Sequence, residues 1–240
     1  MARTLFISDL HLARERPDAT EALHALTRDA RGSTALYVLG DLFDAWLGDD
    51  QVREPFAASV ARSLAALAAD GTRVYLQRGN RDFLLGERFA RASGATLLSD
   101  VEVHDVERRP TLVMHGDLLC TDDAKYQRWR HYAFSERGRA RLLAYPYAVR
   151  RGIAVVLRAV SRRANATKPE AIMDVNDDAV AEALRTHGYP RLIHGHTHRP
   201  ARHEHEVDGR ACERWVLGDW FGEPGYLEVT PERVTPRRVR

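Results

Sequence analysis

Residues 35–41 read ALYVLGD, and this stretch decides the fold. Its first five residues are apolar β-formers between a Gly-Ser-Thr segment and a Gly-Asp pair, which predicts a buried parallel strand ending at Leu39. Asp41 then follows the carboxyl end of that strand, where open α/β sheets bind their ligands. Gly40 allows neighbouring backbone to approach closely. An ordinary strand-to-loop turn reads the same way, so only the recurrence of the pattern favours a functional site.

Four other segments repeat this pattern of a strand followed by side chains that can bind a metal. We expect those strands at residues 4–8, 73–77, 111–114 and 191–193. With Asp41, the side chains that follow the five strands are Asp9, His11, Asn80, His115, His196 and His198. Histidines at alternate positions after a strand are hard to explain by packing alone, so the recurrence indicates a shared site.

Helical periodicity separates most of these strands, and the chain is therefore expected to be an α/β protein. The expected helices are residues 18–30, 52–69, 83–92 and 170–186. Residues 101–106 alternate like a half-buried strand. The closing strands are expected to form an antiparallel meander over residues 203–207, 214–217, 226–229 and 234–239.

The composition is that of an ordinary soluble globular protein. The 240 residues are 44% hydrophobic and 29% charged, with a formal net charge of +2 that argues neither for nor against an anionic partner. Cys120 and Cys212 are too few for a disulfide framework, which favours a reducing compartment. The first residues form a core strand rather than a secretory signal, and we expect no membrane span and a location on the cytosolic side.

Residues 123–168 are the exception, because they hold twelve Lys or Arg against two acidic residues, a net charge of +10. Aromatic and aliphatic residues alternate with the arginines in this segment. The pattern fits an amphipathic element at an anionic membrane surface, a nucleic-acid surface, or a helical insert that packs on its host. We expect an inserted functional cap here, between core segments 1–122 and 169–240.

The side chains at the strand ends suit divalent metal ions. Mixed Asp, Asn and His ligands are typical of Mn²⁺, Fe²⁺ or Zn²⁺, and the absence of Cys among them argues against a structural zinc site. Seven ligands are too many for one tetrahedral ion and are about right for two. A pair of ions about 3.5–4 Å apart is a clamp for phosphoryl chemistry.

The motifs resemble the five ordered blocks of the calcineurin-like metallophosphoesterases. The blocks are Asp9-x-His11, Gly40-Asp41-x-x-Asp44, Gly79-Asn80-Arg81-Asp82, His115-Gly116-Asp117 and Gly195-His196-x-His198. The resemblance implies an αββα sandwich of two mixed β-sheets flanked by helices. It implies one ion on Asp9, His11, Asp41 and His198, and a second on Asp41, Asn80, His115 and His196. Asp44, Asp82, Asp117 and His194 would orient ligands or serve structure rather than bind metal.

Within that superfamily, the chain is similar to the UDP-2,3-diacylglucosamine diphosphatases of lipid A biosynthesis. The match extends to residues 8–12, 40–44, 79–82, 114–123 and 194–200 and to the helical insert. The resemblance implies two Mn²⁺ ions, a peripheral position on the cytoplasmic side of the bacterial inner membrane, and cleavage to UMP and 2,3-diacylglucosamine 1-phosphate. It implies substrate contacts at Asn80, Arg81, Asp123, Ser161, Asn165, Lys168 and His196. The insert would hold acyl chains and contact anionic lipid, with neither nucleic acid nor an obligate protein as partner.

Arg81 departs from the wider superfamily, in which many members have Gly-Asn-His-Glu where this chain has Gly-Asn-Arg-Asp. An alkoxide leaving group needs a proton, whereas a phosphate leaving group, with a second pKa of about 6, does not. We therefore expect pyrophosphate cleavage, with a metal-activated hydroxide attacking the α-phosphorus and with Arg81 and Asp41 as catalytic residues. The alternatives are another dinuclear-metal phosphodiesterase or nuclease, and a scaffold that has lost its metals.

Overall fold

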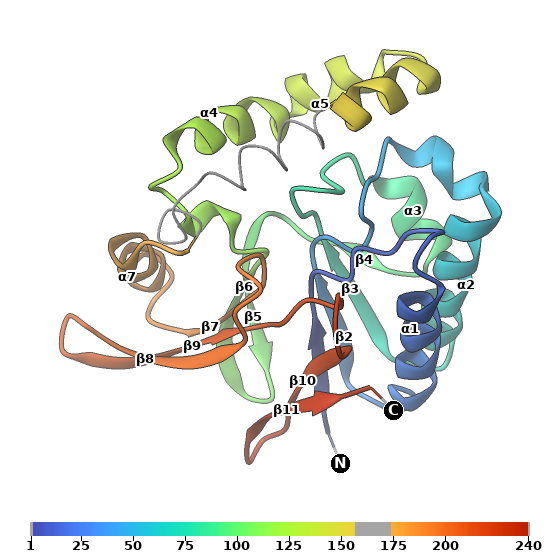
Figure 1. The fold of residues 1–240 in the computed structure, drawn as a ribbon. Helices are drawn as coiled ribbons and strands as arrows, with labels where there is room; N and C mark the ends of the chain where they lie inside the picture. Colours follow the sequence, from blue (N-terminus) through green and yellow to red (C-terminus); the bar gives the residue numbers. More distant parts are fainter. Residues whose placement is uncertain (1, 157–173, 240) are drawn as a thin grey trace.

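Two β-sheets pack face to face, and helices cover their outer faces (Figure 1). The computed structural model describes residues 2–156 and 174–239. One sheet has the strand order β11-β10-β1-β2-β3-β4 and the other β5-β6-β7-β9-β8. Both sheets mix parallel and antiparallel pairs, so the expected α/β sandwich is confirmed.

The six-stranded sheet is centred on β1 and β2, whose residues are buried on both faces. It contains β1 (Thr4–Ile7), β2 (Ala35–Leu39), β3 (Arg73–Gln77), β4 (Thr96–Leu97), β10 (Gly225–Val229) and β11 (Val234–Arg238). Alternate residues such as Leu36 and Val38 pack with the outer helices α1 (Pro17–Asp29), α2 (Pro55–Ala69) and α3 (Glu87–Ala92). Tyr37 and Leu39 point the other way and pack against the second sheet.

The five-stranded sheet places two loops that carry candidate metal ligands at one edge. It contains β5 (Val101–Val106), β6 (Arg109–Met114), β7 (Arg191–His194), β8 (Ala201–Val207) and β9 (Arg210–Val216). Strands β6, β7 and β9 run parallel to one another. Helix α7 (Asp177–Thr186) covers the outer face through Val180 and Leu184, which are fully buried.

Three expectations about secondary structure were wrong. Pro55 begins α2, so the expected helix 52–69 is preceded by the separate 3₁₀ helix η1 (Asp49–Arg53). The expected helix 83–92 begins only at Glu87, because the Asp49 carboxylate accepts hydrogen bonds from backbone N–H groups at its start, including that of Arg88 at 2.7 Å. Helix α7 begins at Asp177 after its cap Asn176, rather than at 170; residues 170–173 lie outside the described residues.

The closing strands do not form one meander. The β8–β9 hairpin belongs to one sheet and the β10–β11 hairpin to the other, and β9 pairs in parallel with β7. Between the two hairpins the chain crosses the metal-binding edge, where the Trp220 backbone N–H donates to the Asp9 carbonyl at 3.1 Å. This crossing brings residues 217–221 to the site.

Residues 123–156, the described part of the basic insert, lie above the carboxyl ends of the central strands (Figure 1). This part contains α4 (Ala124–Ala133), α5 (Glu136–Leu143) and a helical segment at 147–156, and α4 follows the short 3₁₀ helix η2 (Asp117–Leu119). Asp123 and Ser135 cap α4 and α5 by accepting hydrogen bonds from backbone N–H groups. No helix in the described part of the chain is long and apolar enough to cross a membrane. The division into core 1–122 and 169–240 and cap 123–168 stays a prediction.

Candidate metal centre

All seven ligand candidates from the sequence lie together at one edge of the sandwich. Asp9 and His11 follow β1, Asp41 follows β2, and Asn80 follows β3. From the facing sheet, His115 follows β6, and His196 and His198 follow β7. Carboxyl ends of parallel strands meet at one edge, and for this reason residues separated by up to 189 positions come into contact.

The first group contains Asp9, His11 and His198, whose ligand atoms all lie within 4.8 Å of one another. Nε2 of His198 lies 3.3 Å from Oδ1 of Asp9 and 3.4 Å from Nε2 of His11. Asp41 adjoins the group, since its Oδ2 is 3.8 Å from Nε2 of His11. These are the four residues expected to hold one ion.

The second group is built around Asp41, whose carboxylate lies with Asp9 and His115 in a cluster of ligand atoms that are all within 4.8 Å of one another. Oδ1 of Asn80 lies 3.0 Å from both Nε2 of His115 and Nδ1 of His196, and the two imidazole nitrogens are 3.2 Å apart. Oδ1 of Asp41 is 3.9 Å from Nε2 of His115. Asp41 therefore has one carboxylate oxygen toward each group, the arrangement expected of a bridging ligand. The assignment of each residue as a ligand stays a prediction.

The backbone at these positions is strained. Five of the seven candidates have φ in the left-handed region, which non-glycine residues rarely adopt: Asp9 (56°), His11 (48°), Asp41 (52°), His196 (70°) and His198 (56°). Each such residue costs about 1–3 kcal/mol, and such residues cluster at functional sites. The fold holds these side chains inward at the expense of local stability.

Two glycines make the close packing possible. A Cβ on Gly40, which has φ of +87°, would meet Nδ1 of His115 at 2.6 Å and the Gly79 backbone at 2.8 Å. A Cβ on Gly195 would collide with the side chains of Ser8 and Asp9. The approach of neighbouring backbone that the sequence predicts at Gly40 is therefore real.

The donor set fits divalent cations. Nδ1 of His115 donates to the Leu39 carbonyl at 2.9 Å, so in the neutral ring the lone pair of Nε2 faces the site. That lone pair lies beside the carbonyl oxygen of Asn80 and Nδ1 of His196, and one proton cannot satisfy all three atoms. A cation at the centre would satisfy them together, so the residues present fit the metals that the motif implies.

The charges of the site lead to the same conclusion. Burial raises the pKa of Asp41 to about 8. Burial would lower the pKa of His115, but the carboxylates of Asp41 and Asp9 raise it to about 9. Burial lowers the pKa of His11 to about 3 and that of His196 to about 4. The protein alone thus holds protons where carboxylates crowd together, and bound cations would replace them.

Partners around the site orient these side chains. Asp82 is fully buried and accepts hydrogen bonds from the backbone N–H groups of Gly79, Asp41 and Phe43 at 2.7–3.3 Å. It therefore holds the loops after β2 and β3 together, as the sequence predicts of an orienting residue. Asp117, likewise predicted, accepts hydrogen bonds from Tyr126 and Arg130 of α4 at 2.5 and 2.6 Å and so joins the site to the cap.

His194, predicted to be structural, lies at the end of a chain of hydrogen bonds from Arg214. Both side chains are buried. The guanidinium of Arg214 donates to Nε2 of His194 at 3.2 Å, which leaves Nδ1 to donate to the Gly195 carbonyl at 2.9 Å. These hydrogen bonds hold the Gly195 backbone and, with it, the start of the loop that carries His196 and His198.

Sequence reasoning missed Asp219, whose Oδ2 lies 3.2 Å from Nδ1 of His198. A carboxylate on the second nitrogen of a metal-binding imidazole fixes its tautomer and orientation. A signal for it was present, because the segment Val-Leu-Gly-Asp occurs at both 38–41 and 216–219. Phe221 was also missed: it is 60% exposed, stacks on the His11 ring at 4.9 Å, and lies under the Arg16 guanidinium at 4.5 Å.

Of the seven expected substrate contacts, four lie in the described part of the chain and three do not. Asn80 and His196 lie in the second ligand group, and Arg81 adjoins it, with its backbone N–H donating to Oδ1 of Asp41 at 2.7 Å. Asp123 lies at the start of the cap, where its carboxylate accepts from the Tyr126 N–H at 3.1 Å. The other three, Ser161, Asn165 and Lys168, lie outside the described residues.

Sequence comparison finds closely similar proteins. The model of the family described as calcineurin-like phosphoesterase matches residues 2–200. A UDP-2,3-diacylglucosamine hydrolase of Aromatoleum aromaticum is 50% identical over 224 residues, which cover 93% of this chain and 91% of the relative. A protein of the same name from Escherichia coli O157:H7 is 48% identical over 232 residues, 96% of each chain.

Solved structures agree at the level of fold. A dimetal phosphatase from Danio rerio has a TM-score of 0.54 at 14% identity, and the match covers 99% of this chain and 95% of that one. A protein of Thermus thermophilus has a TM-score of 0.51 at 13% identity, with all of both chains covered. With its matching family model, its close relatives and its edge of clustered ligands, the chain belongs to the calcineurin-like phosphoesterase family.

Proposed function

We propose that this protein hydrolyses UDP-2,3-diacylglucosamine to UMP and 2,3-diacylglucosamine 1-phosphate in lipid A biosynthesis. One observation carries the proposal: two adjoining ligand groups that share Asp41 lie beneath a basic cap with exposed apolar side chains. Such a site joins phosphoryl chemistry to the recognition of a lipid. Relatives that match nearly the whole chain carry the name of this hydrolase, which supports the same substrate.

We assign two Mn²⁺ ions to the site, one to each ligand group. When bound, the ions supply a nucleophile at neutral pH, by lowering the pKa of a water ligand, and neutralise charge on the phosphate. The protein's own contribution is orientation. Asp82 fixes the loops that carry Asp41 and Asn80, and Asp219 and the Leu39 carbonyl fix the imidazoles of His198 and His115.

Arg81 is placed to serve the diphosphate. Its backbone is fixed between Oδ1 of Asp41 and the Trp46 N–H, which donates to the Arg81 carbonyl at 3.2 Å. The residue is half-buried, and its positive charge is close enough to His11 to help lower the pKa of that imidazole. A guanidinium there neutralises phosphate charge without giving up a proton, which suits attack at the α-phosphorus and departure of the sugar 1-phosphate.

The cap offers the apolar surface that acyl chains need. Among the residues that the structure describes, eight large hydrophobic side chains are exposed, and six of them lie on the cap: Tyr132, Leu143, Tyr145, Val149, Val155 and Val156. Each acyl CH₂ buried contributes about 0.8 kcal/mol, so even partial capture of the chains would dominate substrate affinity. With the arginines around them, these side chains also suit peripheral binding to the cytoplasmic face of an anionic inner membrane.

The reaction is tested with the purified protein, Mn²⁺ and UDP-2,3-diacylglucosamine in detergent micelles, in water enriched in ¹⁸O. We expect UMP that carries the label, because attack at the α-phosphorus puts the water oxygen on UMP. UDP-N-acetylglucosamine and bis(4-nitrophenyl) phosphate serve as comparators without acyl chains. Rapid turnover of the simple diester with none of the lipid substrate would contradict the proposal and favour a phosphodiesterase or nuclease.

Membrane binding is tested by flotation with vesicles of phosphatidylglycerol or of phosphatidylcholine. We expect flotation with the anionic vesicles and its loss in Val149→Asp, which puts a charge on the cap. Val103→Asp is the matched control, since Val103 is 45% exposed on β5, outside the cap, where Val149 is 44% exposed. Equal flotation of the two variants would contradict a membrane role for the cap.

A further inference from the structure

His11 differs from His115 and His198 in what holds its ring. On those two histidines, the nitrogen that faces away from the ligand group has an oxygen beside it, the Leu39 carbonyl at 2.9 Å and the Asp219 carboxylate at 3.2 Å. Nε2 of His11 faces the first ligand group, 3.4 Å from Nε2 of His198. Its Nδ1 is buried and, in the part of the chain that the structure describes, has no hydrogen-bond partner. The usual means of fixing a metal-binding imidazole is therefore missing at His11.

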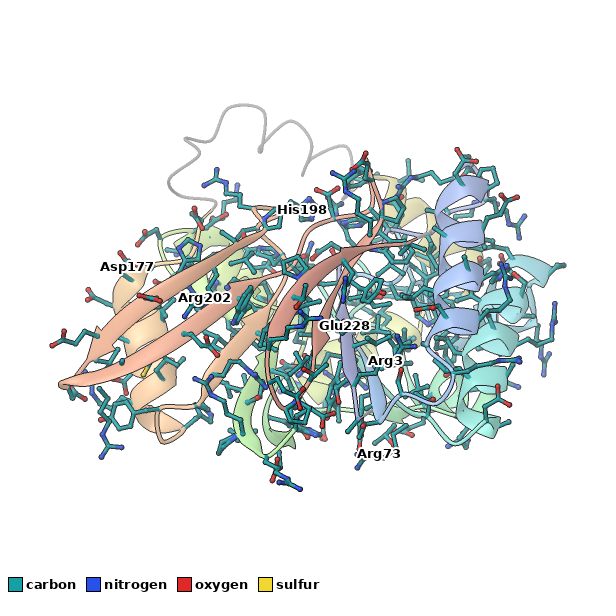
Figure 2. All side chains as sticks on the ribbon, turned by 90° about the horizontal axis from the view of Figure 1, so that it is seen from below. Arg3, Arg73, Asp177, His198, Arg202 and Glu228 are labelled. Atoms are coloured by element: carbon teal, nitrogen blue, oxygen red, sulfur yellow. The ribbon has the colours of Figure 1, made fainter. Side chains whose placement is uncertain are left out.

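The ring of Phe221 lies against the His11 imidazole instead. The two ring centroids are 4.9 Å apart and the ring planes are inclined by 20°, which is a stacked arrangement. His198, whose ring lies 6.0 Å from that of Phe221, is labelled in Figure 2, where the sandwich is seen from below. Phe221 thus lies beside two candidate ligands of the first group.

The hydrophobic core does not account for the place of this ring. Phe221 is 60% exposed, whereas the preceding Trp220 is 1% exposed and belongs to the core. The Phe221 backbone N–H donates to Oδ1 of Asp219 at 2.8 Å, and the other oxygen of that carboxylate contacts His198. The backbone of Phe221 is therefore tied to the metal centre, while its ring extends over His11.

Arg16 holds Phe221 in turn. Its guanidinium carbon lies 4.5 Å from the centroid of the Phe221 ring, a cation–π contact. Nη1 of Arg16 donates to the carbonyls of Leu10 and His11, both at 3.0 Å, and Nη2 donates to the Trp220 carbonyl. One guanidinium therefore joins the loop that carries His11 to the loop that carries Phe221.

We propose that Phe221 is a positioning residue, whose ring holds the His11 imidazole so that Nε2 is directed into the first ligand group. Stacking does for His11 what an oxygen on the second nitrogen does for His115 and His198. Because the contact is between flat rings, it restricts the tilt of the imidazole. The inference rests on the metal assignment proposed above and is independent of the identity of the substrate.

The first test is Mn²⁺ binding, measured by electron paramagnetic resonance of free Mn²⁺ for wild type, Phe221→Ala and Phe221→Tyr. In Phe221→Ala we expect one of the two affinities to fall about threefold to tenfold, the effect of losing one aromatic pair, and the other to stay unchanged. Phe221→Tyr keeps the flat ring and should keep both affinities. The control is Tyr132→Ala, which removes an aromatic ring that is 47% exposed on α4 and should change neither affinity. Unchanged affinities in Phe221→Ala, an equal loss at both sites, or an equal loss in Phe221→Tyr would overturn the proposal.

The second test needs no metal. In crystal structures of the metal-free protein, we expect Nε2 of His11 to stay close to Nε2 of His198 in wild type and in Phe221→Tyr, and to move away in Phe221→Ala. An unmoved imidazole in Phe221→Ala would overturn the proposal whatever the affinities. A wild-type protein that binds no Mn²⁺ would contradict the metal assignment instead, and the position of the His11 ring would still decide the role of Phe221.

Discussion

Each of the two Val-Leu-Gly-Asp segments, 38–41 and 216–219, contains a glycine. Replacing each glycine by alanine measures how tightly the backbone is packed at the candidate metal centre. Gly40 has φ of +87°, and a Cβ there would meet His115 at 2.6 Å and the Gly79 backbone at 2.8 Å. Gly218 has an ordinary φ, and a Cβ there would contact only Pro200, at 3.4 Å or more. The same substitution, Gly to Ala after the same two residues, therefore meets opposite environments.

The expected destabilisation follows from these contacts. In Gly40→Ala, the left-handed backbone costs about 1–2 kcal/mol for an alanine, and forcing a methyl group against fixed backbone costs about 1–3 kcal/mol more. We therefore expect the free energy of unfolding to fall by about 2–5 kcal/mol. In Gly218→Ala, we expect a change within about 0.5–1 kcal/mol of zero, since alanine there is unstrained and restricts the unfolded chain.

The measurement is urea unfolding of both variants and wild type with bound metal removed, followed by far-UV circular dichroism. Removing the metal separates the packing effect from any loss of metal binding. Turnover is then measured with saturating Mn²⁺, where Gly40→Ala should lose activity and Gly218→Ala should retain it. Equal destabilisation of the two variants, or a stable Gly40→Ala, would refute the argument from close approach.

Three further predictions test the site and its surroundings. Asp219→Asn should weaken Mn²⁺ binding about 10–100-fold in calorimetric titrations, because it removes the charge that orients His198. The control is Asp208→Asn, at an exposed turn, which should leave the Mn²⁺ affinity unchanged. Equal affinities of the two variants would contradict this role of Asp219. Chelating the metal should lower Tm by about 5–10 °C relative to protein at 100 times the metal Kd, and an unchanged Tm in scanning calorimetry would argue against metal in the fold. Burial raises the pKa of Cys120 to about 12, so its thiolate at pH 8 should be about a thousandfold scarcer than that of a free thiol and should resist iodoacetamide until the protein unfolds, as mass spectrometry would show.

The seven ligand candidates were predictable because chemistry and topology agree at the strand ends. Each of these strands, such as 35–39, is a short and mostly apolar run that is followed within two residues by Gly or Asp. Parallel strands bring those ends to one edge without any knowledge of the loops. The sequence thus predicted which side chains lie together, whereas the 3.0–3.9 Å distances between them depend on the packing of two sheets.

What escaped the sequence depends on contacts between distant segments. The start of α3 is set by the Asp49 carboxylate, which lies 38 positions earlier in the chain than Glu87, and no local signal at 83–87 reveals it. The division of the last strands between two sheets likewise depends on which strand has a free edge for pairing. Strand β9 pairs with β7, and β10 pairs with β1. Local periodicity predicts a strand but does not choose its neighbour.

The repeated Val-Leu-Gly-Asp segment shows that position in the fold, more than local sequence, decides whether a carboxylate lies among the candidate metal ligands. At 38–41 the strand is central, Gly40 turns the chain tightly, and the Asp41 side chain is 2% exposed, within 4 Å of His11 and His115. At 216–219 the strand lies beside the edge strand, its glycine adopts an ordinary conformation, and the Asp219 side chain is 24% exposed. Because Asp41 is desolvated and strained, it has more to gain from a cation. Asp219 remains partly solvated, and its carboxylate contacts Nδ1 of His198, so its position suits it to orient that ring.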